Sequence, residues 1–96
     1  MNGKSEVHYA LKNAVEALAT AQGIDYERLK RAVSELRVLK KADFEHSIDV
    51  TMLEIIKTAE GRIDLDDKAS VDVHNVMRNI WTLYDRWAPK FATRPI

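Results

Sequence analysis

The sequence predicts an all-helical fold, and two observations lead to that prediction. Apolar residues return every three or four positions along four stretches, each roughly 16–20 residues long. Because an α-helix has about 3.6 residues per turn, this spacing places each apolar set along one side of a helix. The connections between the stretches are short, which favours antiparallel neighbours. We therefore expect an antiparallel up-down four-helix bundle, with an irregular orthogonal four-helix array as the alternative.

A glycine turn joins the first two expected helices. The first helix spans about residues 5–22, with Ser5 as a good N-cap and Gly23 as the left-handed residue that commonly closes a helix. Asp25 caps the second helix, which spans about residues 26–41. The first helix is rich in alanine, so it can approach a neighbouring helix closely.

A change of helical phase separates the second helix from the third. Neither glycine nor proline stands between Gly23 and Gly61, so one long bent helix is the alternative. At about 100° per residue, however, the apolar residues of the two halves centre on directions about 130° apart. We therefore expect a break near residues 40–42, with Asp43 capping a third helix at about residues 44–60. The glycine that follows is expected to end that helix.

The connection at residues 62–68 is the longest and most acidic in the chain. We expect Ile63 and Leu65 to pack inward from it. Either Asp64 or Ser70 is expected to cap the helix that follows.

The last helix is expected at about residues 68–88. Pro89 ends it, because proline lacks a backbone donor and disfavours helical geometry in the preceding residue. Residues 89–96 are then expected to form a frayed tail. The chain has 96 residues and no cysteine, and we expect residues 1–96 to form a single domain around one core.

Composition narrows the classes of function. Fifteen basic and fifteen acidic side chains cancel, so no global field attracts nucleic acid or an anionic membrane. The amino terminus lacks the apolar core of a secretory signal, and charges interrupt every apolar run well short of a membrane span. The sequence contains no thiolate nucleophile, phosphate cradle or nucleophile elbow. We expect a cytoplasmic protein that is not an enzyme, needs no cofactor and does not bind membranes.

No pattern of metal ligands is present. His8, His46 and His74 belong to neither an HExxH pair nor the Glu-x-x-His pattern of di-iron bundles, and the nearest match is Asp43-x-x-His46. The acidic run that begins at Asp64 lacks the glycine and the glutamate that a calcium loop needs at its sixth and twelfth positions. We therefore expect no metal site.

The second helix carries a basic stripe, with six basic side chains against two acidic ones. The segment at residues 18–33 resembles a helix-turn-helix, with a small residue four positions before the turn glycine and aliphatic residues one and six positions after it. The second helix of such a motif enters the major groove. The other interpretation is a solvated basic face that balances acidic neighbours. The residues that would contact nucleic acid are Lys30, Arg31, Arg37 and Lys41.

The last helix holds the best candidate for an interaction surface. Trp81 lies at the border of the apolar face, about 100° from Ile80, and Val71 points roughly to the opposite side. Tryptophan is favoured at the centres of protein interfaces. We predict a small non-enzymatic protein–protein interaction module, such as an adaptor, inhibitor or accessory protein, that binds another protein or self-associates as a homodimer. A DNA-binding regulator is the alternative. The predicted protein-binding residues are Trp81, Val71 and His74.

Overall fold

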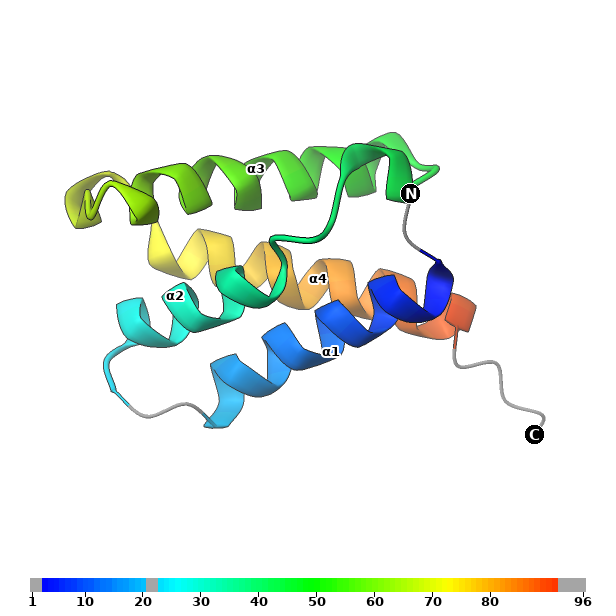
Figure 1. Cartoon of the computed structure of the whole chain (residues 1–96), viewed down its shortest axis with the longest axis horizontal. Helices are drawn as coiled ribbons and strands as arrows, with labels where there is room; N and C mark the ends of the chain where they lie inside the picture. The colour runs from blue at the N-terminus through cyan, green and yellow to red at the C-terminus, as the bar shows by residue number, and fades with distance from the viewer. Residues whose placement is uncertain (1–2, 21–22, 92–96) are drawn as a thin grey trace.

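Helices dominate the computed structural model, which describes residues 3–20 and 23–91 (Figure 1). No strand occurs within these residues, so the prediction of an all-helical fold with four packed helices is confirmed. The ends of the predicted first helix (residues 21–22) and of the predicted tail (residues 92–96) lie outside the described residues. The elements are α1 (Lys4–Thr20), α2 (Asp25–Glu35), the 3-10 turn η1 (Lys41–Asp43), α3 (Ser47–Asp64), the 3-10 turn η2 (Lys68–Ser70) and α4 (Val73–Phe91).

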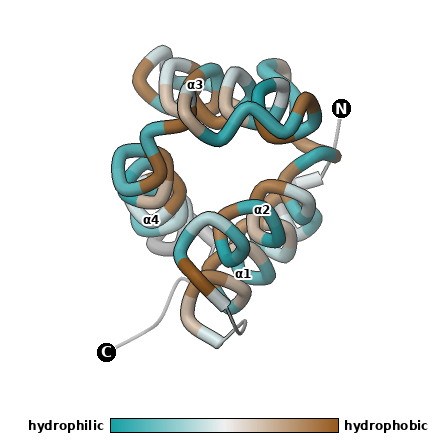
Figure 2. The backbone as a smooth tube through the Cα atoms, turned by 90° about the vertical axis from the view of Figure 1, so that its left-hand side faces the viewer, coloured by the Kyte–Doolittle hydropathy of each residue, from teal (hydrophilic) through white to brown (hydrophobic). Residues whose placement is uncertain are grey.

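The four helices pack unequally. α1 packs along both α2 and α4, whereas α3 packs mainly against α4 and touches α2 less. Viewed end-on, α3 and the α1–α2 pair lie on opposite sides, and α4 lies beside both (Figure 2). α4 therefore contacts every other helix. The antiparallel up-down arrangement of the four helices stays a prediction.

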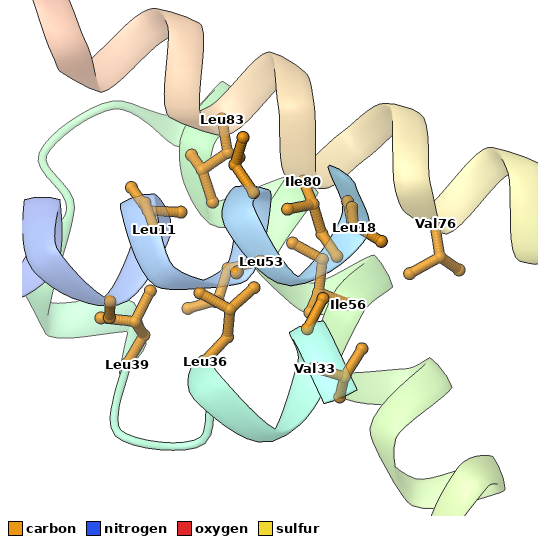
Figure 3. Packing of buried hydrophobic residues seen from close by; sticks show 14 of the residues in the cluster. Leu11, Leu18, Val33, Leu36, Leu39, Leu53, Ile56, Val76, Ile80 and Leu83 are labelled. Carbon is orange, nitrogen blue, oxygen red and sulfur yellow. The ribbon is translucent and has the colours of Figure 1, made fainter. Parts of the chain in front are cut away.

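Leucine and isoleucine side chains from all four helices fill the core between them (Figure 3). Each such side chain contributes about 1.5–3 kcal/mol when it is removed from water, before the opposing chain entropy is counted. Three alanines of α1 are also buried, and small side chains let this helix approach its neighbours closely. The largest fully buried apolar side chains are Leu11, Leu29, Leu36, Leu39, Leu53, Ile56, Ile80 and Leu83.

A break between α2 and α3 is confirmed, but it begins earlier and is longer than predicted. α2 ends at Glu35, well before the predicted end, and residues 36–46 lead to α3. Leu36, Leu39 and Phe44 of this connection are all buried. In a continuous helix the last two of them would point about 140° apart. By leaving the helix, the chain turns both side chains toward the core.

Asp43 does not cap α3 as predicted. Its carboxylate accepts a hydrogen bond from the backbone N–H of Lys40 at 2.8 Å, inside the turn η1. α3 begins later, at Ser47, and His46 occupies its N-cap position without a side-chain cap hydrogen bond. Asp43 therefore stabilises the turn that redirects the chain.

α3 continues through Gly61, contrary to the prediction that this glycine ends it. Asp66 closes the helix instead, with a left-handed φ of 57°. The N–H groups of Asp66 and Asp67 donate to the carbonyls of Ile63 and Arg62, both at 2.9 Å. This is a Schellman arrangement in which an aspartate takes the position that glycine usually occupies.

Only one of the two apolar residues predicted to pack inward after this helix does so. Ile63 is 4% exposed, but Leu65 is 81% exposed, so the prediction for Leu65 is wrong. Ile63 stands seven positions after the buried Ile56 and shares its side of the helix. Leu65 follows two positions later and therefore points away from the core.

The start of α4 also differs from the prediction, since neither Asp64 nor Ser70 caps it. Asp72 does so, because its Oδ1 accepts a hydrogen bond from the backbone N–H of Asn75 at 3.2 Å. The helix extends to Phe91, past the end predicted before the proline. A proline removes a single backbone donor, and here that loss does not end the helix.

An ion pair between a buried aspartate and a partly exposed arginine fixes the start of α3 on α4. Asp49 lies in the first turn of α3 and is 2% exposed. Its Oδ1 accepts a hydrogen bond from the Nε of Arg86, which comes from α4. A buried charge without a partner is strongly destabilising, so the two side chains hold the helices in one relative position.

Arg86→Met should lower the free energy of unfolding by about 3 kcal/mol, because it leaves the Asp49 carboxylate buried without its partner. Denaturant unfolding measures the change. The double variant Asp49→Leu/Arg86→Met is the control, and it should recover most of the loss because both charges are removed together. Equal losses in the single and double variants would contradict this assignment.

Gly61→Ala should raise the free energy of unfolding by about 0.5–1 kcal/mol, because alanine favours the helix over the unfolded chain. A Cβ atom at this position meets no atom within 4 Å. Gly23→Ala is the matched control and should destabilise the protein, since Gly23 has a φ of +111° that alanine adopts only with strain. If Gly61→Ala proved less stable than the wild type in thermal unfolding, the helical placement of this glycine would be wrong.

Candidate protein-interaction surface

Two of the four basic residues predicted to face nucleic acid form ion pairs with α3. Arg37 Nη1 lies 2.8 Å from Glu60 Oε2, and its Nη2 lies 2.6 Å from Asp64 Oδ1. Lys41 Nζ lies 2.9 Å from Glu54 Oε2. Part of the basic stripe is therefore paired with acidic side chains of α3, although both basic side chains stay about half exposed or more.

A lysine of α3 strengthens the same junction. Lys57 Nζ donates to the carbonyls of Leu36 and Arg37 at 3.3 and 3.0 Å. These carbonyls follow the end of α2, where helical partners run out and a cation is favoured. Lys30 and Arg31 are exposed on α2. The helix-turn-helix interpretation stays a prediction, and two residues of its turn lie outside the described part of the chain.

The Arg37–Asp64 contact shifts the pKa values of both partners. The hydrogen bond from Arg37 is the largest influence on Asp64 and lowers its pKa, and the nearby charges of Arg37 and Lys30 act in the same direction. The same hydrogen bond raises the pKa of Arg37. Both side chains are about half exposed, so water screens the pair and limits what it adds to stability.

The solvent side of α4 presents four exposed residues on one stripe. His74, Arg78, Trp81 and Asp85 are spaced by four, three and four positions, which aligns them along a helix. We call these four residues the outer stripe. Trp81 is 43% exposed, whereas Trp87, on the core side of the same helix, is 8% exposed. The outer stripe therefore contains a large aromatic side chain that the fold buries only in part.

The outer stripe borders the seam between α4 and α1. Tyr84 of α4 stacks on His8 of α1, with ring centroids 6.0 Å apart. At the other end of the stripe, His74 Nε2 lies 3.3 Å from Asp25 Oδ2 of α2. Both side chains of that pair are mostly exposed, so the contact is weak and leaves the imidazole accessible.

Val71, the third predicted protein-binding residue, lies elsewhere. It precedes α4, is partly buried against the core, and lines a shallow open groove with Ile55 and Arg62 of α3. The structure therefore brings His74 and Trp81 onto one stripe and leaves Val71 on the α3 side of α4.

The histidines considered as metal ligands are spread over different elements. His46 precedes α3 and His74 lies in the first turn of α4, and these two helix starts lie at opposite ends of the molecule (Figure 1). Among the described residues, no three histidine or carboxylate side chains are grouped as ligands for a metal ion.

Ile24 and Leu65 are among the exposed aliphatic residues of the described chain, and both lie outside the helices. Ile24 is 66% exposed and Leu65 is 81% exposed. Near these loops, Lys68 Nζ of η2 lies 5.1 Å from the ring centroid of Tyr26 in the first turn of α2. Burial is the main cause that raises the pKa of Tyr26, and the neighbouring acidic side chains add to it. Both aliphatic residues fall outside the apolar periodicity of the helices. This departure from the periodicity is the sequence signal that could have indicated their exposure.

Comparisons with protein families, with curated proteins and with solved structures found no match to this chain. Within the described residues, no helix combines the length and the apolar character that crossing a membrane requires.

Asp64→Asn should destabilise the protein near neutral pH and lose this effect in acid. Arg37 lowers the pKa of Asp64 in the folded protein, so the carboxylate adds stability above its unfolded pKa of about 3.9. That stability disappears as the pH falls through the lowered folded value. Urea unfolding at neutral and strongly acidic pH should therefore show a difference from the wild type only at neutral pH.

Asp67→Asn is the control for this experiment, because Asp67 is an exposed aspartate of the same connection for which no ion pair is found among the described residues. It should change stability little at either pH. A destabilisation by Asp64→Asn that persisted in strong acid would contradict the proposed role of the charge.

Proposed function

We propose that this protein is a small interaction module without catalytic activity that self-associates through the outer stripe of α4. The exposure of Trp81 carries the proposal, since 43% of this residue is open to solvent on a helix that packs against three others. Tryptophan is enriched among the residues that dominate binding energy, because its rigid ring buries a large apolar area at a small cost in conformational entropy.

The rigidity of α4 supports the proposal. The helix packs against α1, α2 and α3, and the buried contact between Asp49 and Arg86 ties it to the start of α3. A surface held in place before binding loses little conformational freedom when a partner arrives. A second copy is a favourable partner, because a two-fold axis uses the same patch twice.

The proposal extends to the architecture and the location of the protein. We infer one domain over residues 1–96, built as an antiparallel up-down bundle and located in the cytoplasm. The packing of α1 with α2 and of α3 with α4 supports this architecture, since each pair is consecutive in the chain. The lack of cysteine is compatible with a reducing compartment.

Nucleic-acid binding is not favoured by any contact of the basic residues. Arg37 and Lys41 form ion pairs with carboxylates of α3. Two exposed carboxylates, Asp25 and Glu27, stand in the first turn of α2, where a recognition helix would approach phosphate. We therefore propose no DNA-binding function.

Trp81→Ala should lower the mass of the protein in sedimentation equilibrium from dimer toward monomer, while the helical circular dichroism signal is retained. The expected loss of affinity is at least about 30-fold, as is common for a central tryptophan. Leu65→Ala is the control, because it removes a more exposed apolar side chain that lies in a loop outside α4. An unchanged mass for Trp81→Ala, or a wild type that is monomeric at all concentrations, would refute the proposal.

A further inference from the structure

We infer that a second copy of the chain binds the outer stripe in the antiparallel direction, with its two-fold axis level with the midpoint between Arg78 and Trp81. This inference rests on the proposed function and adds to it the direction and the register of the partner. It is argued from the spacing of the stripe and from the chemistry of its four members.

The spacing of the outer stripe is the same when read from either end. Its residues are separated by four, three and four positions. An antiparallel copy turned about the midpoint therefore places Arg78 opposite the partner's Trp81 and His74 opposite the partner's Asp85. No other register in this direction brings all four residues into opposition.

The residues brought together in this way are chemically complementary. A guanidinium group stacks favourably on the face of an indole ring, and the imidazole of His74 can donate to the carboxylate of Asp85. The two-fold axis makes each of these contacts twice. A parallel copy would instead place Arg78 against arginine and Asp85 against aspartate, and like charges oppose association.

The charged members of the stripe are available for these contacts. Arg78 and Asp85 are exposed, and no ion pair is found for either among the side chains that the structure describes. His74 contacts Asp25 only through a mostly exposed pair, which an approaching carboxylate can replace. The outer stripe therefore presents a cation, an aromatic face and an anion. Read along the helix, this order is complementary to the same order in an antiparallel copy.

A complementation experiment tests this register. Arg78→Ala removes the guanidinium groups and Trp81→Ala removes the indoles, so each variant alone loses both symmetric stacking contacts. Arg78→Ala should dimerise about tenfold more weakly than the wild type, and Trp81→Ala at least about 30-fold more weakly. In an equimolar mixture, Arg78 of the Trp81→Ala chain meets Trp81 of the Arg78→Ala chain, which restores one of the two contacts. The mixture should therefore form heterodimers more tightly than either variant forms homodimers.

Sedimentation with one variant fluorescently labelled measures the mixed species, and thermal unfolding checks that each variant folds. Arg31→Ala removes an exposed arginine of α2 and should leave dimerisation unchanged. A mixture that associates no better than the separate variants would overturn the register. If Trp81→Ala weakens association and Arg78→Ala does not, the register is wrong and the proposed function stands. If neither substitution changes the mass, both fail.

Discussion

The burial of one face of α4 is the constraint on which the rest of the structure depends. Val76, Ile80, Leu83 and Trp87 turn toward the core, and each of the other helices packs against this one. Other sides of α4 pack against α1 and α3, so only a narrow strip of this helix faces solvent. Trp81 lies on this surface. The same helical phase that completes the core therefore sets the position of the candidate surface.

Ion pairs complement this apolar packing where α3 meets its neighbours. One end of α3 is tied to α4 by Asp49 and Arg86, and the other end is tied by Asp64 to Arg37 in the connection that follows α2. α3 touches α2 less than it touches α4, so directional contacts at its two ends help to fix its position. They also match Arg37 and Lys41, two basic residues that follow α2, with acidic side chains of α3.

Features that depend on the apolar phase of a whole helix can be predicted from the sequence. Features that depend on how a single residue interacts with its neighbours cannot. The four helices, the break after α2 and the border position of Trp81 follow from apolar spacing alone. Gly61 was expected to end α3, yet the helix runs through it because Asp66 takes the left-handed conformation instead. Asp43 caps a turn rather than a helix. The pairing of Arg37 with α3 depends on how two helices lie across each other, which spacing does not encode.

In the proposed dimer, α4 buries one face in the core and offers its outer stripe to a second copy. A dilution series followed by NMR tests it most directly, since every backbone amide and both indole N–H groups report separately. We expect concentration-dependent shifts at His74, Arg78, Trp81 and Asp85, with the amides of Lys30 and Arg31 in α2 and of the centre of α3 unchanged. Spectra that do not change on dilution, or changes centred on Lys30 and Arg31, would contradict it.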